Sequence, residues 1–317
     1  MSGGALVSSP LSSSIRLLSD AQLEQIHNAS LEILRRTGVR VHDTEARDLL
    51  GDAGCLISDG DLVKFPAAVV EDAAEHAPSR IVLSHRSGDT RLVLEGQKSH
   101  FGTGSDLPNT LDLESGERRL SLLSDVADTA RLADALPNLD FVMSMALPSD
   151  VPRESSDRHS FLTMVANTSK PIVFTAWDES GLADIIAMAE TVAGGAEALV
   201  KHPFLVAYLE PTTPLQHSQT ALRKMLMMAD KGLPFVYSPG PVEGATAPVT
   251  PAGALAIANA EVLSGLVIAQ LRRPGAPVIY GSGSGPLDMR TTVATYVSPE
   301  FMLHCKAIAE LGHHLYK

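Results

Sequence analysis

The chain has 317 residues, of which 44% are apolar, enough to fill the core of one large α/β domain or two ordinary ones. Its 37 acidic residues outnumber the 25 basic ones and give a net charge of -12, which argues against nucleic acid or an anionic membrane surface as partners. Cys55 and Cys305 are the only cysteines, too few for a disulfide framework or a cysteine-ligated metal site, and they suit a reducing cytoplasm.

The start of the chain has the composition of a loose tail. Residues 1–18 are predicted to be disordered, because the segment up to Ser14 is rich in glycine and serine and lacks the basic start and apolar run of a signal peptide. The longest apolar stretch, 252–271, is interrupted by Asn259 and Glu261, so we predict no membrane span. We therefore expect a cytoplasmic protein.

An N-terminal α+β module is predicted over residues 19–98. Ser19 and Gln22 have capping-box spacing and Gly38 follows the periodic segment, which predicts a helix over 20–37. The apolar patterns predict further helices at 45–53 and 66–76 and strands at 80–84 and 91–94.

From residue 99 onward, short apolar strands alternate with longer amphipathic helices, the pattern of βα units around a parallel sheet. The strands are expected at 99–101, 141–146, 172–176, 204–209, 234–237 and 278–280. The helices are expected at 122–135, 155–167, 181–193, 215–231, 251–272 and 299–315. The continuous apolar runs indicate strands that are buried on both faces.

Six such units favour a TIM-type barrel over residues 99–317. A closed barrel has eight strands, and this chain ends with the sixth helix, so we expect a barrel that is incomplete at its C-terminus. The alternative is an open, doubly wound sheet, which binds ligands through a glycine-rich turn that enters a helix. The glycine-rich run 281–285 continues into Pro286 and Leu287 without a helix start, and this favours the barrel.

The signatures of several enzyme classes are missing from the sequence. It contains no Gly-x-Ser-x-Gly elbow, no P-loop and no His-Glu-x-x-His motif. His304, His313 and His314 share the last predicted helix but lack the spacing that places two ligands on one helix face, so we expect no metal site.

Polar and glycine-rich segments follow the predicted strands, at the rim where a barrel assembles its active site. These segments are 102–106, 177–179, 210–213, 238–240 and 281–290. Any one of them also has a purely structural explanation, because βα loops need glycine, proline and capping residues. The hypothesis of a shared site therefore depends on the set.

Aromatic residues make up only 4% of the chain, yet several of them lie in the predicted strands or just after them. Trp177, Tyr208, Tyr237 and Tyr280 are candidates for holding a quaternary or protonated amine by cation–π attraction, at about 0.5 to 2 kcal/mol each. The alternative is that aromatic residues simply favour strands.

A carboxylate and a guanidinium follow the sixth strand closely, at Asp288 and Arg290. One interpretation is a surface ion pair. The other is that Asp288 faces a cationic head group while Arg290 binds a carboxylate or a cofactor side chain.

The sequence resembles the trimethylamine methyltransferase family, which includes relatives that act on glycine betaine and other quaternary amines. The resemblance is collinear from Leu18 almost to the end. It is carried by LSDAQL at 18–23, FGTGS at 101–105, NAEVLSG at 259–265, PGAPVIYGS at 274–282 and DMRT at 288–291. It implies a TIM barrel that passes a methyl group from a methylated amine to the Co(I) corrinoid of a separate protein docked over the barrel mouth.

The resemblance implies an amine:corrinoid protein Co-methyltransferase that binds no cofactor itself and takes its corrinoid from the partner. We expect a homo-oligomer. The expected substrate-binding residues are Trp177, Tyr208, Glu210, Tyr237, Tyr280, Asp288 and Arg290. The loops expected to face the corrinoid contain Gly102, Gly104, Asp106, Gly281 and Gly283. The alternatives are a non-catalytic protein that binds quaternary amines and an inactive, truncated fragment.

Overall fold

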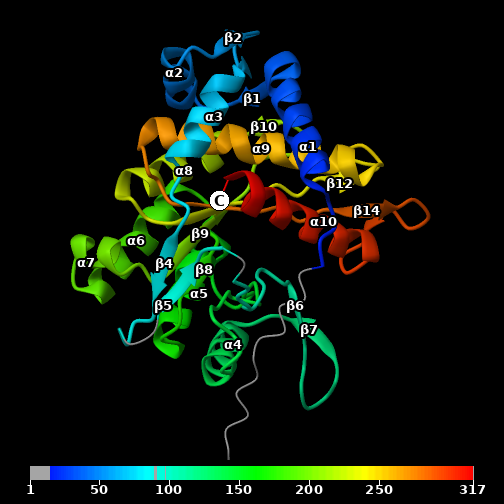
Figure 1. Ribbon diagram of the computed structural model, residues 1–317. Helices are drawn as coiled ribbons and strands as arrows, with labels where there is room; N and C mark the ends of the chain where they lie inside the picture. The colour runs from blue at the N-terminus through cyan, green and yellow to red at the C-terminus, as the bar shows by residue number, and fades with distance from the viewer. Residues whose placement is uncertain (1–14, 89–90, 97, 317) are drawn as a thin grey trace, which may run out of the picture.

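The computed structural model describes residues 15–88, 91–96 and 98–316 (Figure 1). The tail predicted over 1–18 lies outside the described residues except for its last four positions.

The N-terminal part is a mixed α+β arrangement. Its elements are α1 (Asp20–Glu32), β1 (Val39–Val41), α2 (Thr44–Asp52), β2 (Leu56–Ser58), β3 (Leu62–Lys64), α3 (Ala67–His76), β4 (Ile81–Ser84) and β5 (Arg91–Leu94). A π-helical turn over Ile33–Thr37 extends α1 to Gly38, whose φ of 81° lies in the left-handed region that ends helices. The helix predicted over 20–37 is confirmed, and so are the two shorter helices and both strands that follow it.

The start of α1 has the capping geometry that the sequence predicts. The Ser19 hydroxyl accepts a hydrogen bond from the Gln22 backbone N–H at 3.3 Å, and the Gln22 side-chain oxygen accepts one from the Ser19 N–H at 2.9 Å. We expect Ser19→Ala to lower the free energy of unfolding by about 1 kcal/mol in a urea titration, because it removes the cap. Gln25→Ala, at an exposed position in the same helix, is the control and should change stability by less than about 0.5 kcal/mol.

A parallel sheet forms the centre of the molecule (Figure 1). Its strands are β8 (Ile172–Phe174), β9 (Leu205–Leu209), β11 (Phe235–Tyr237) and β13 (Val278–Tyr280), paired in the order β13-β11-β9-β8. Single parallel bridges extend the sheet, because Val142 pairs with Ile172 and Gly102 pairs with Phe141. Six parallel segments therefore lie side by side in chain order. Among the described residues, β13 pairs only with β11, so no pairing closes the sheet into a ring.

The strands predicted at 99–101 and 141–146 are reduced to these bridges. The Thr103 side chain takes the place of backbone hydrogen bonds between the two segments. Its hydroxyl accepts from the Met143 N–H at 2.7 Å and donates to the Met143 carbonyl at 2.8 Å. Met145 then takes a left-handed φ of 53°, which a regular strand does not allow.

One face of the sheet is covered by the hairpin of β4 and β5. Ile81 and Leu83 belong to one apolar cluster with Val173 and Val206. Two backbone bonds fix the hairpin near the amino ends of the strands: the Ser84 N–H donates to the Pro203 carbonyl, and the Arg86 N–H donates to the Ser169 carbonyl, both at 2.8 Å. The hairpin therefore covers this face of the sheet at the end where the strands begin.

Helices α5 (Ser156–Asn167), α8 (Gln219–Lys231) and α9 (Pro251–Arg272) pack against the strands of the sheet. The other helices of this part are α4 (Leu123–Ala135), α6 (Glu179–Ala193), α7 (Ala196–Lys201) and α10 (Pro299–Leu311), with a 3-10 turn before α5 (Arg153–Ser155) and a π-helical turn after α10 (Gly312–Tyr316). The six helices predicted for this part are confirmed, but α8 begins four residues later than the 215–231 prediction, and α7 was not predicted.

Helix α9 connects the two parts of the chain. It packs against α1 and α3 on one side and against α8 on the other. It is long and apolar enough to cross a membrane by length and composition, but 83% of its most apolar window is buried inside the protein. Its polar residues have internal partners: buried Glu261 accepts hydrogen bonds from the Thr213 hydroxyl at 2.8 Å and the Leu215 N–H at 2.6 Å.

Several short strands were not predicted. They are β1, β2 and β3 of the N-terminal part, and β6 (Asn109–Leu111), β7 (Arg118–Leu120), β10 (Gln216–His217), β12 (Val242–Glu243), β14 (Gly285–Asp288) and β15 (Val293–Ala294). Strand β10 pairs with β1 in parallel, so the small N-terminal sheet contains a strand from the region after residue 98.

Candidate functional site

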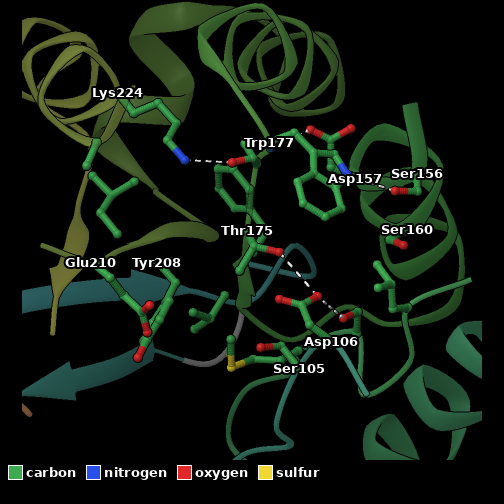
Figure 2. A pocket seen from close by; sticks show the side chains of 18 of the residues that line it. Ser105, Asp106, Ser156, Asp157, Ser160, Thr175, Trp177, Tyr208, Glu210 and Lys224 are labelled. Carbon is green, nitrogen blue, oxygen red and sulfur yellow. Dashed lines mark hydrogen bonds between the residues drawn. The ribbon is translucent and has the colours of Figure 1, made fainter. Parts of the chain in front are cut away.

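A cavity of about 590 Å³ lies at the carboxyl ends of β8 and β9 (Figure 2). Its walls come from the loop 104–106, the segment 143–147, the residues that follow β8 and β9, and the facing sides of α5 and α8. Five of the residues predicted for the site line it. They are Gly104, Asp106, Trp177, Tyr208 and Glu210.

Asp106 is held at the cavity by an unusual backbone. Its φ is 60°, and Met145 opposite also has a positive φ. The two loops are joined by backbone bonds from the Met145 N–H to the Gly104 carbonyl at 2.9 Å and from the Leu107 N–H to the Met145 carbonyl at 3.0 Å. Left-handed residues other than glycine concentrate at functional sites, where the surrounding structure enforces them.

The Asp106 carboxylate has only weak partners. The Thr175 hydroxyl approaches it at 3.3 Å (Figure 2) and the Ser144 hydroxyl at 3.4 Å. Within the described part of the chain, no basic side chain comes within 4 Å of it. Its negative charge is therefore free to act on a ligand in the cavity.

Trp177 is fixed by two hydrogen bonds that it donates to side chains of α5. Its indole N–H donates to the Ser156 hydroxyl at 2.9 Å, and its backbone N–H donates to Asp157 at 3.0 Å. The residue remains 43% exposed, and the Arg153 guanidinium lies 5.4 Å from the centroid of its ring. One face of the indole thus already contacts a cation, so a ligand has to use the remaining surface.

Tyr208 and Glu210 lie beside each other on the wall opposite Asp157 (Figure 2). Burial, followed by the charge of Glu210, raises the pKa of Tyr208 above its ordinary value, so the phenol stays protonated. This wall therefore offers an aromatic ring, a hydroxyl donor and an acidic group.

Lys224 of α8 is a cavity residue that the sequence interpretation missed. Its ammonium donates to the Ala176 carbonyl at 2.6 Å. Burial lowers its pKa, while the negative charges of Asp157, Asp178 and Glu210 act in the opposite direction. The sequence does contain a signal for this residue: Lys224 lies on the same side of the helix as buried Ala221 and Met228. A lysine on the buried face of a helix is unusual and indicates a functional role.

Asp157, Ser156 and Ser160 of α5 were also missed. Asp157 is only 8% exposed, and besides Trp177 it binds Arg158 through an ion pair of 3.2 Å. The i, i+4 spacing of Ser156 and Ser160 is the sequence signal for a polar helix face that points into a cavity.

Tyr237 and Tyr280 do not line the cavity. Successive side chains of a strand point to opposite faces, and Val236 and Ile279 occupy the face covered by the β4–β5 hairpin. Tyr237 is therefore fully buried against α9, where a Cβ at Gly265 would lie 2.3 Å from its ring. Tyr280 points to α9 as well and donates to the Asn259 side chain at 2.8 Å. The structure therefore places both tyrosines outside this cavity, and no contact with a substrate is observed for either.

Asp288 and Arg290 do not line the cavity either. They lie on the hairpin of β14 and β15, which projects away from β8 and β9 (Figure 1). The Asp288 carboxylate accepts from the Arg290 N–H at 2.9 Å and the Thr291 hydroxyl at 2.8 Å, so it stabilises its own turn. Among the described residues no ion pair joins the two side chains, and the role in substrate binding predicted for them stays a prediction.

The glycines predicted to face the corrinoid differ in their surroundings. A Cβ at Gly104 would meet only the Met145 sulfur, at 3.8 Å, and one at Gly281 would meet nothing within 4 Å, so both border open space. Gly102 is a packing glycine, because a Cβ there would lie 2.3 Å from the Phe141 ring. Gly283 lies 3.7 Å from the Phe301 ring by the same measure.

The described residues include no group of three or more histidine, cysteine or acidic side chains that would suit a metal ion. His304 is fully buried and makes a 3.2 Å hydrogen bond with Ser282. Burial lowers the pKa of this histidine to about 4.

Residues 8–316 match the sequence profile of the family described as trimethylamine methyltransferase (MTTB). The chain belongs to the trimethylamine methyltransferase family. It is 32% identical to a trimethylamine methyltransferase of Desulfitobacterium hafniense, over 93% of this chain and 60% of the relative. It is 34% identical to the Methanosarcina thermophila trimethylamine methyltransferase, over 94% and 63% of the two chains. It is 29% identical to a glycine betaine methyltransferase of Desulfitobacterium hafniense, over 93% and 62%.

The family resemblance drawn from the sequence is thus confirmed, and the chain spans about 60% of the length of these curated relatives. Among solved structures, the monomethylamine methyltransferase of Methanosarcina barkeri superposes with a TM-score of 0.54 at 10% identity, covering 92% of this chain and 58% of that one. A hydroxylamine complex of MtmB gives a TM-score of 0.56 at 11% identity. These similarities show a shared mixed α/β fold.

Proposed function

We propose that this protein is a methyltransferase that moves a methyl group from a methylated amine, either trimethylamine or a quaternary amine such as glycine betaine, to the Co(I) corrinoid of a partner protein. The observation that carries the proposal is the cavity at the strand ends. There the aromatic rings of Trp177 and Tyr208 lie together with the carboxylates of Asp106 and Glu210. Aromatic faces and carboxylates are the groups that bind a quaternary ammonium ion.

The chemistry asks for positioning rather than for an acid or a nucleophile from the protein. The bond from nitrogen to methyl breaks, its electron pair stays on nitrogen, and a quaternary ammonium ion leaves as a neutral tertiary amine. Trimethylamine itself would have to leave as an amide anion and needs a proton or another activating group. The cavity residues bind the cation, orient its methyl group toward the opening and keep water away from it.

The corrinoid supplies the Co(I) nucleophile when its protein is docked. The residues at the cavity fit the approach of a large group from outside, because Gly104 borders open space and Trp177 is 43% exposed; Gly281, outside the cavity lining, borders open space as well. Gly104, Asp106 and Gly281 are the residues of this chain proposed to face the partner.

We also propose that the parallel sheet is part of a TIM barrel. Six parallel segments in chain order support this arrangement, and so does the position of the cavity at the carboxyl ends of the strands.

The test is a cobalt methylation assay with this chain, a reduced corrinoid protein and a panel of methylated amines. We expect the Co(I) absorbance to decrease only when both this chain and one of the amines are present. Amine binding by calorimetry without any methylation would instead assign a binding protein. Neither binding nor methylation with any amine would contradict the proposal.

A further inference from the structure

The cavity contains one basic side chain, and that side chain has no ion pair among the described residues. The Lys224 ammonium has three N–H donors, and one of them is used by the Ala176 carbonyl. No acidic oxygen of the described residues lies within 4 Å of it, although acidic residues line the same cavity. Two donors of a partly desolvated cation are thus available to a ligand.

The acidic neighbours of Lys224 are engaged elsewhere or face solvent. Asp157 is bound by Arg158 and by the Trp177 backbone N–H, and Asp178 caps α6 by accepting from the Gly181 N–H at 2.8 Å. Glu210 is exposed, so water screens its charge. Holding a half-buried ammonium without an ion pair costs free energy, which an anionic group of a ligand would recover.

The charges in the cavity are also ordered in space. Lys224 and Asp106 lie on opposite sides of the cavity, with Thr175 and Trp177 between them (Figure 2). A ligand that complements this order has a negative group at one end, a small linker, and a cationic group at the other end. A simple alkylamine complements only half of it.

We propose that the cavity selects a zwitterionic methylated amine, whose carboxylate pairs with Lys224 while its ammonium group faces Asp106 and the aromatic wall. This inference rests on the proposed function, because it takes the cationic end as the methyl donor. It assigns Lys224 as a specificity-determining residue, which discriminates betaines from amines that carry no acid group.

The test compares three ligands of similar shape by calorimetry on the full chain. Glycine betaine carries both charges, choline carries only the cation, and 3,3-dimethylbutyrate carries only the carboxylate. We expect the wild type to bind glycine betaine at least about tenfold more tightly than either of the others. Lys224→Met should weaken glycine betaine at least about tenfold and leave choline unchanged or bound more tightly. Lys224→Arg should restore part of the preference.

A matched control lies on the same helix. Lys231 is paired with Glu190 at 2.6 Å and is not a cavity residue, so Lys231→Met should leave all three affinities unchanged. Retained choline binding shows that the cavity of Lys224→Met is folded.

Equal binding of choline and glycine betaine by the wild type would overturn the inference, and so would an equal loss of both in Lys224→Met, while the proposed amine site would stand. Failure of both cations to bind the wild type would count against the proposed function itself. Binding of 3,3-dimethylbutyrate as tight as that of glycine betaine would assign an anion site and reject the role of the ammonium group.

Discussion

Replacing Glu261 by glutamine is expected to remove a loss of stability of about 3 kcal/mol that the wild-type protein undergoes between pH 4.5 and pH 8. Burial raises the pKa of Glu261 from 4.5 to about 7. Below its ordinary pKa the carboxyl is protonated in both the folded and the unfolded chain. As the pH rises toward 7, the unfolded chain releases the proton while the folded chain retains it, so folding becomes less favourable.

The measurement is urea unfolding of both proteins from pH 4.5 to pH 8, reported as the difference between them so that other titrating groups cancel. Glutamine suits this comparison, because its carbonyl accepts from the Leu215 N–H and its amide donates to the Thr213 hydroxyl, which preserves both contacts. Two curves that run parallel over the whole range would show that Glu261 does not titrate in this way.

Asp106→Asn is expected to weaken the binding of tetramethylammonium roughly 10- to 100-fold. Two unit charges 4 Å apart attract by about 1 kcal/mol in water and about 4 kcal/mol near a protein surface. Because Asp106 is exposed to solvent, we expect an attraction between these two values, which corresponds to the stated loss of affinity. Asparagine has nearly the same shape and tolerates the left-handed φ of 60°, so the substitution removes charge and little else.

Calorimetry at fixed ionic strength checks this result. Asp128→Asn is the control, because it removes one exposed acidic charge on α4, outside the cavity, and should leave the affinity within twofold of the wild type. An equal effect of both variants would mean that the overall charge of the protein, rather than Asp106, attracts the cation.

Helix limits were the most predictable part of the fold. The limits predicted for α9 agree with the structure at both ends, because Thr250 precedes a proline at the first helical position and Pro274 follows its end closely. The start of α8 could not be placed, since Leu215 and His217 fit an apolar helix pattern but are held in place by Glu261 and by the pairing of β10 with β1. Those bonds come from residues distant in the sequence.

The direction of strand side chains limited the prediction of the site. Tyr237 and Val236 are both apolar enough for either face, so the sequence does not reveal which one faces the helices. Trp177 and Glu210 line the cavity because they lie just beyond the ends of strands, and their position in the sequence relative to those strands was enough to place them there. The same reasoning could not identify Lys224, because this residue lies on a helix and reaches the cavity only through tertiary packing.

The hairpin of β4 and β5 has a kinetic consequence for the proposed reaction. It blocks passage along the sheet from the amino ends of the strands, so the cavity has its access at the carboxyl ends. A corrinoid protein seated there would cover the route by which small molecules come and go. Turnover should then follow a compulsory order, in which the donor arrives before the acceptor protein and the demethylated product departs only after that protein dissociates.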